Sequence, residues 1–205
     1  MTWIHRIKYP ESTGYLREPY DRVKGPAGNI DNVMKVHCLR PHTMEGHSAI
    51  YKSVMHHTGN TLPVWLLEAV GVYTSLCNGC DYSVQHHYTG LRRQLSDDAR
   101  ADAIYRALAA GRPEDAFEGR DLAFLRYAAK LTRAPAHMTE DDVAAMRDAI
   151  VGAGADDGEI FEVNQVCAYF NYSNRLLNGL GITTDGDVPG ESPPETNDVT
   201  DWKHE

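Results

Sequence analysis

The hydrophobic and polar positions recur at helical spacing along most of the chain, and no segment alternates with period two long enough to predict a strand. The clearest stripe of apolar positions follows the 3–4 spacing of one buried helix face: Ile160, Val163, Cys167, Phe170, Asn174 and Leu177. Asp156 and Glu159 predict the start of this helix, and Gly179 and Gly181 predict its end. The pattern therefore predicts an all-α fold.

Residue types that suit helix termini divide the rest of the chain. Thr43 is expected to cap a helix that runs to about residue 57. The segment LPVWLLEAVGVYTSL (62–76) is apolar on most faces, which is typical of a buried helix. A further helix is expected over 80–93, after the break at Asn78-Gly79. Three more are predicted over 97–110 (capped by Ser96 or Asp97), 120–132 and 139–150.

Composition divides the chain into three parts. Residues 1–40 carry scattered Pro and Gly without sustained periodicity, so we expect an irregular N-terminal arm over the surface or over a neighbouring subunit. Residues 41–182 form the helical domain, predicted as one compact helical bundle. Residues 183–205 are polar and rich in Pro and Gly, so we expect a C-terminal tail that is mobile in the monomer.

The bulk composition narrows the classes of partner. The formal net charge of −9 disfavours nucleic acid, and no segment approaches the roughly 20 apolar residues needed to cross a membrane. The N-terminus does not resemble a signal peptide, and the chain has only 4 cysteines. We therefore expect a cytoplasmic protein, in which a close C-x-x-C is more often metal-binding or catalytic than structural.

The stretch LCNGCDYSVQHH (76–87) collects most of the candidate chemistry. Cys80, Ser83 and His87 share one helix face, and Cys77 forms a C-x-x-C with Cys80. A helix start lowers the pKa of a thiol, so we expect Cys80 to be the most reactive cysteine. Glu68 lies on the apolar helix before it and needs a partner, which this face supplies. The same spacing also fits a satisfied polar pocket in a helical core.

A metal site is the next alternative for this stretch. Cys77, Cys80, His86 and His87 could supply four ligands, but adjacent histidines on a helix point about 100° apart. We expect no metal and no cofactor. Histidines elsewhere, such as His47, are expected to be surface or capping residues.

The joint spacing of Glu68, Cys80, Ser83 and His87 resembles the signature of the alkylhydroperoxidase AhpD-like, carboxymuconolactone decarboxylase family. That signature is a Glu, about a dozen residues, then C-x-x-C-x-x-x-H. The stretches RPHTMEGH and AYFNYSNRLLNGLGI also look like the peroxidase-related members, so the resemblance covers about residues 35–182. It implies a compact helical fold assembled as a homo-oligomer. Ser83 stands where the family has its attacking cysteine, and Cys80 matches the resolving one.

The resemblance leaves three functions open. The first is a thiol oxidoreductase that reduces hydroperoxides with a dithiol or lipoyl-protein donor, in which Cys80 reacts and Cys77 resolves. The second is a decarboxylase-like acid–base enzyme, in which Glu68 and His87 transfer protons on a small organic acid and Ser83 orients it. The third is a noncatalytic family member that serves in binding or assembly.

Overall fold

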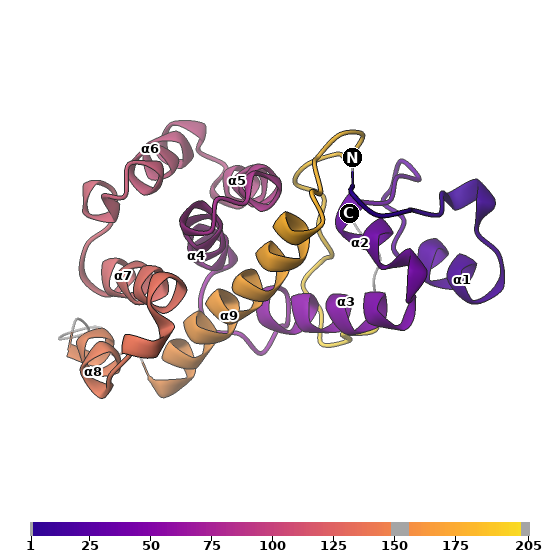
Figure 1. Ribbon diagram of the computed structural model, residues 1–205. Helices are drawn as coiled ribbons and strands as arrows, with labels where there is room; N and C mark the ends of the chain where they lie inside the picture. Colours follow the sequence, from indigo (N-terminus) through magenta and orange to yellow (C-terminus); the bar gives the residue numbers. More distant parts are fainter. Residues whose placement is uncertain (1, 149–155, 202–205) are drawn as a thin grey trace.

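The computed structural model describes residues 2–148 and 156–201, and the expected all-α fold is confirmed over these residues. The helices are α1 (Gly14–Arg22), α2 (Asn32–Lys35), α3 (His42–Met55), α4 (Val64–Cys77), α5 (Asp81–Leu95), α6 (Asp98–Ala109), α7 (Gly119–Arg133), α8 (Glu140–Asp148) and α9 (Asp157–Gly179) (Figure 1). Within the described part of the chain, no helix combines the length and apolar character needed to span a bilayer.

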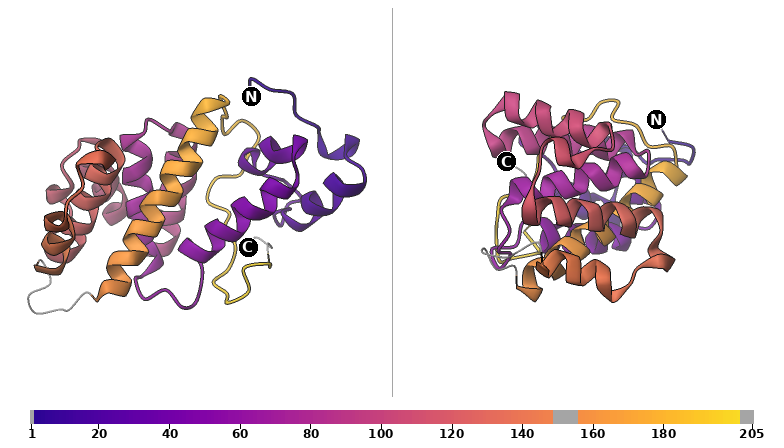
Figure 2. Two further views of the ribbon diagram at one scale, coloured as in Figure 1. Left: turned by 60° about the horizontal axis from the view of Figure 1, so that its bottom comes forward. Right: turned by 90° about the vertical axis from the view of Figure 1, so that its left-hand side faces the viewer.

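Helix α4 is the centre of the core. It packs against α5, α6, α7 and α9, and every residue from Leu66 to Ser75 is buried, as its nearly uniform apolar composition predicts. Long α9 crosses it at Gly71, where a Cβ would lie 2.4 Å from Cε2 of Phe170. Figures 1 and 2 show α9 running between the group α4–α8 and the group α1–α3. Two groups of helices therefore meet along α9.

Local capping signals placed most helix termini correctly. Asp97 accepts a hydrogen bond from the backbone N–H of Arg100, and Asp156 accepts one from the backbone N–H of Glu159, as N-caps do. The exception is Thr43, which was expected to cap α3 but lies inside its first turn. Its hydroxyl instead bonds the carbonyl of Arg40 and the ring of His37. The last two residues of the predicted helix 139–150 lie outside the described residues.

The N-terminal segment differs from the irregular arm that was expected. It contains α1, α2 and two short 3-10 turns, and these bury their own hydrophobic cluster together with the start of α3. The members of this cluster are Leu16, Tyr20, Val23, Ile30, Met34, Cys38 and Met44. Helices of nine and four residues are too short to produce a recognisable period, and Pro19 inside α1 reads as a breaker.

The C-terminal segment, which was expected to be a mobile tail, contacts distant parts of the chain between residues 183 and 201. Thr196 pairs with His57 through a β-bridge, and its backbone N–H donates to the carbonyl of His56 at 2.9 Å. The side chain of Asp187 is fully buried and accepts hydrogen bonds from the backbone N–H of Asn32 and from the Tyr82 hydroxyl. Polar composition predicted solvation, whereas these polar groups form hydrogen bonds with specific partners far away in the sequence.

Candidate active site

A small cavity of about 50 Å³ lies where α3, α4, α5 and α9 meet the C-terminal segment. Glu68 of α4 and Ser83 and His87 of α5 line it, together with Tyr51 of α3 and Tyr169 of α9. Since one water occupies about 10–15 Å³ of such space, the cavity has room for a few waters or a very small ligand. Three of the predicted site residues, Glu68, Ser83 and His87, therefore line the same cavity.

Glu68 and His87 form the expected pair. The Glu68 carboxylate is 2% exposed, and its Oε2 lies 2.8 Å from Nδ1 of His87, whose side chain is 15% exposed. Because an ionised carboxylate only accepts hydrogen bonds, Nδ1 carries the proton of this hydrogen bond, and in the neutral imidazole Nε2 then has the lone pair. Nε2 has no hydrogen-bond partner among the described residues, so the basic nitrogen is free for a ligand.

Gly90 makes room for this pair. A Cβ at position 90 would lie 2.6 Å from Oε1 and 3.0 Å from Cδ of Glu68, well inside van der Waals contact. The missing side chain lets the carboxylate lie directly against the backbone of α5, one turn beyond His87. Gly90 was not singled out in the sequence, and an isolated Gly within a helical pattern is the signal that could have found it.

The Ser83 hydroxyl is positioned from α9. Its Oγ accepts a hydrogen bond of 2.9 Å from Nδ2 of Asn174, whose Oδ1 in turn accepts one of 3.0 Å from Nδ2 of Asn78. Since the Asn174 amide acts as donor, the Ser83 proton remains free to donate. The sequence placed Asn174 in the buried stripe, but its role as the residue that orients Ser83 was missed.

Cys80 is buried beside this group and not on the cavity wall. Its side chain is 1% exposed, packs with Val36, Leu177 and Ile182, and has Sγ 3.6 Å from Oγ of Ser83. Burial raises the pKa of the Cys80 thiol, and hydrogen bonds from Ser83 only partly oppose this. The expected lowering of this pKa by the helix start is therefore not found, because desolvation outweighs it.

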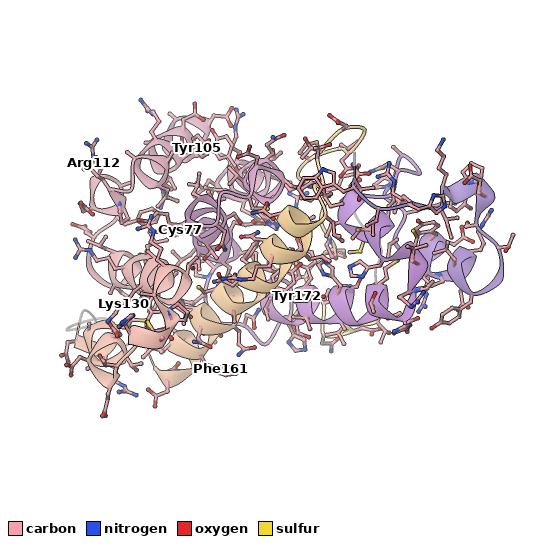
Figure 3. The ribbon with its side chains drawn as sticks, in the orientation of Figure 1. Cys77, Tyr105, Arg112, Lys130, Phe161 and Tyr172 are labelled. Atoms are coloured by element: carbon pink, nitrogen blue, oxygen red, sulfur yellow. The ribbon has the colours of Figure 1, made fainter. Side chains whose placement is uncertain are left out.

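Cys77 is the last residue of α4. It packs with the main core, and Figure 3 places it in the group α4–α8. Burial raises the pKa of the Cys77 thiol, while the nearby Arg133 opposes the rise. Both thiols are free, and they belong to different hydrophobic clusters. Half-buried Cys77 is the more accessible of the two.

The adjacent histidines have different partners, as their position on one helix predicted. His87 bonds Glu68, whereas His86 stacks on Tyr82 and has Nε2 3.6 Å from Oδ2 of Asp187. Within residues 2–148 and 156–201, no three metal-ligating side chains come together.

Aromatic side chains of α3 and α9 complete the wall. His47 was expected to be a surface or capping residue, but it is 2% exposed and its Nε2 lies 3.2 Å from the Tyr169 hydroxyl. Burial lowers the pKa of His47 to about 3, so this ring is neutral. Tyr51 contacts the His87 ring edge-on, with ring centroids 6.1 Å apart. His47 and Tyr51 are four positions apart on the predicted helix, and this spacing could have indicated that both lie on one helix face.

Comparison with known proteins shows which solved structures share this fold. No protein-family model and no curated protein matches the chain. Among solved structures, an uncharacterized peroxidase-related protein from Ralstonia eutropha JMP134, described as an alkylhydroperoxidase AhpD core, has a TM-score of 0.74 at 24% identity, covering 92% of this chain and 97% of the other. An uncharacterized peroxidase-related protein from Silicibacter sp. TM1040 has a TM-score of 0.66 at 24% identity, covering 78% and 79%.

A third similar structure is the debrominase Bmp8 in its apo form, with a TM-score of 0.66 at 18% identity, covering 90% of this chain and 91% of the other. The chain therefore has the AhpD-like fold that the sequence motif predicted. At these identities the likeness extends to the fold alone, and the chemistry has to be argued from the residues of the cavity.

Proposed function

We propose that this protein is an enzyme in which Glu68 and His87 move a proton on a small organic substrate held in the cavity, with Ser83 as a hydroxyl that orients it. The contact that carries the proposal is the 2.8 Å hydrogen bond between Glu68 and His87, with both residues on the cavity wall. A buried carboxylate that holds an imidazole in one tautomer is a recurrent arrangement for general-base catalysis.

The proton transfer follows from this geometry. Nε2 of His87 takes a proton from the substrate, and the resulting imidazolium is stabilised by the adjacent Glu68 carboxylate. The same ring returns the proton to another atom of the substrate as general acid. A positioned acid or base of this kind contributes about 10²–10⁴-fold to the rate.

Incorporation of solvent deuterium tests the proposal. Small carbonyl compounds and lactones are incubated with the enzyme in D₂O, and exchange at carbon is followed by proton NMR. We expect His87→Gln to lose about 10²–10⁴-fold in exchange rate and Cys80→Ser to retain it. Exchange that requires Cys80 and survives His87→Gln would contradict the proposal.

A thiol peroxidase is the second candidate. Sγ of Cys80 lies 3.6 Å from Oγ of the cavity residue Ser83, and two of the similar structures are described as peroxidase-related. In this reaction two thiols reduce a hydroperoxide to an alcohol and water and become a disulfide, with Cys77 as the resolving thiol and a dithiol as reductant. Burial of Cys80 and its separation from Cys77 in the packing weigh against it. Loss of two thiols per chain on addition of tert-butyl hydroperoxide would support it.

We also propose that the protein assembles with copies of itself. Phe161 is 62% exposed and Tyr172 is 46% exposed on α9 (Figure 3). Eleven residues separate them, which is about three helical turns, so both lie on one face. An exposed aromatic face of this kind fits a subunit contact. Light scattering that gives the mass of a monomer at micromolar concentration would contradict this.

A further inference from the structure

A second group of charged residues lies at the end of the cavity formed by the N-terminal and C-terminal segments. Asp31, directly before α2, and Glu191, of the C-terminal segment, both line the cavity. Neither belongs to the Glu68–His87 pair. Asp187 lies close by, since the charges of Asp187 and Glu191 both act on Asp31. Three carboxylates from distant parts of the chain therefore meet near one end of a small space.

One oxygen of the Asp31 carboxylate lacks a hydrogen-bond partner. The residue is 6% exposed, and its Oδ1 is buried and accepts no hydrogen bond from any described residue. A native protein rarely leaves a buried carboxylate oxygen unsatisfied, because the lost hydration is costly. Burial raises the pKa of Asp31 to about 6, and the like charges of Asp187 and Glu191 add to this rise, while His86 opposes it.

The cationic side chains near this end of the cavity lie closest to Asp187. Lys35 has its Nζ 3.8 Å from Oδ1 of Asp187, and His86 has its Nε2 3.6 Å from Oδ2 of the same carboxylate. Both therefore lie at Asp187. Oε2 of Glu191 accepts a hydrogen bond of 2.8 Å from Nδ2 of Asn29, whose amide carries no charge. Within the described residues, neither Asp31 nor Glu191 forms an ion pair, and the charges of His86 and Lys35 only partly offset that of Asp31.

Aromatic rings form much of the remaining wall. Tyr51 and Tyr169 pack with ring centroids 5.6 Å apart, and Tyr82 lies at the same end as Asp31. Burial raises the pKa of all three phenols, so they stay neutral. The faces of neutral aromatic rings attract cations, and the attraction is stronger in a site that excludes water. The carboxylates and the aromatic faces therefore both favour a cationic ligand.

We propose that the cavity binds a small primary ammonium compound, whose N–H groups bond Asp31 and Glu191 while the rest of the molecule extends toward Glu68 and His87. Only the extension of the ligand toward Glu68 and His87 rests on the proposed function; the binding of the ammonium group does not. A primary ammonium is compact and carries three donors and no acceptor, which matches unsatisfied carboxylate oxygens in a cavity of about 50 Å³. A carboxylate substrate, such as a small organic acid, would meet like charges in this space.

Three probes of equal length test the charge preference: propylammonium, 1-propanol and propionate. Each is titrated into ¹⁵N-labelled full-length protein, and binding is read from the backbone amide signals of Glu191 and Ser192. We expect propylammonium to bind at least about tenfold more tightly than 1-propanol, the ratio that a charge-assisted hydrogen bond supplies, and propionate to bind least. Equal binding of all three, tighter binding of propionate, or no binding at all would overturn the proposal.

Two substitutions assign the preference to its residues. Asp31→Asn keeps the shape of the side chain and removes its charge, so it should abolish the advantage of propylammonium over 1-propanol. Glu191→Gln provides the same test on the C-terminal segment should the first variant not fold. Asp98→Asn, an exposed change on α6, is the matched control and should leave the ratio intact. An unchanged ratio in both folded cavity variants would overturn the assignment.

The two proposals fail separately. His87→Gln removes the proposed base but leaves Asp31 and Glu191 in place, so it should bind propylammonium like the wild type. Loss of amine binding with deuterium exchange retained in the wild type would refute the ligand class alone. Amine binding without dependence of exchange on His87 would refute the catalytic role alone.

Discussion

Replacing Gly90 by Ala perturbs the Glu68–His87 pair without touching either residue. In an exposed helix interior, Gly→Ala stabilises by about 1 kcal/mol. At position 90 the new methyl group would lie 2.6 Å from Oε1 of Glu68, so the carboxylate has to move. Glu68 is 2% exposed and bonded to His87, and a displaced carboxylate loses a charge-assisted hydrogen bond worth about 1.5–3 kcal/mol. We therefore expect Gly90→Ala to lower the free energy of unfolding by about 0.5–2 kcal/mol.

Gly46 of α3 is the matched control. It is exposed, and a Cβ there would meet nothing within 4 Å. Gly46→Ala should therefore raise the free energy of unfolding by up to about 1 kcal/mol. Chemical denaturation measures both variants, and deuterium exchange should fall at least about tenfold in Gly90→Ala only. If Gly90→Ala stabilises as much as Gly46→Ala and keeps full exchange, Glu68 does not lie against α5 as described.

Three further outcomes follow from the site. Burial raises the folded pKa of Asp31 from 3.8 to about 6, so its ionised form destabilises the fold above pH 6 and not below about pH 4. Asp31→Asn should therefore raise the free energy of unfolding by up to about 3 kcal/mol at pH 7 and leave it unchanged at pH 4; equal effects at both pH values would contradict this. Ser83→Cys should bring or strongly increase hydroperoxide reduction with a dithiol donor, because it supplies a thiol on the cavity wall; a wild type as fast as the variant would show that its own cysteines suffice. Timed alkylation should label half-buried Cys77 before buried Cys80 and Cys167; the reverse order would contradict the packing.

The features that the sequence predicted correctly are those encoded within a few residues of one another. Helices α4 to α9 follow from periodicity and from caps such as Asp97 and Asp156, which act within one turn. The Glu68–His87 pair was predictable for a related reason. A carboxylate on an apolar helix needs a partner, and the next helix offers one polar face.

The features that the sequence did not reveal depend on contacts between distant segments. Asp187 binds Asn32 and Tyr82, more than a hundred residues away, and these contacts order a segment whose composition predicts mobility. The carboxylate group that Asp31 and Glu191 form on the cavity wall is visible only once the fold brings the C-terminal segment beside Asp31. Composition describes an average tendency, whereas these contacts depend on which individual groups meet in the fold.

The state of the His87 ring tests the central claim most directly, because it requires no substrate. Nitrogen NMR of ¹⁵N-labelled histidine distinguishes a ring nitrogen that carries a proton from one with a free lone pair. At neutral pH we predict that His87 carries its proton on Nδ1, bonded to Glu68, with Nε2 unprotonated, and that Glu68→Ala abolishes this preference. A His87 ring protonated at Nε2 in the wild type, or one whose state is unchanged by Glu68→Ala, would contradict the account of this site as a poised general base.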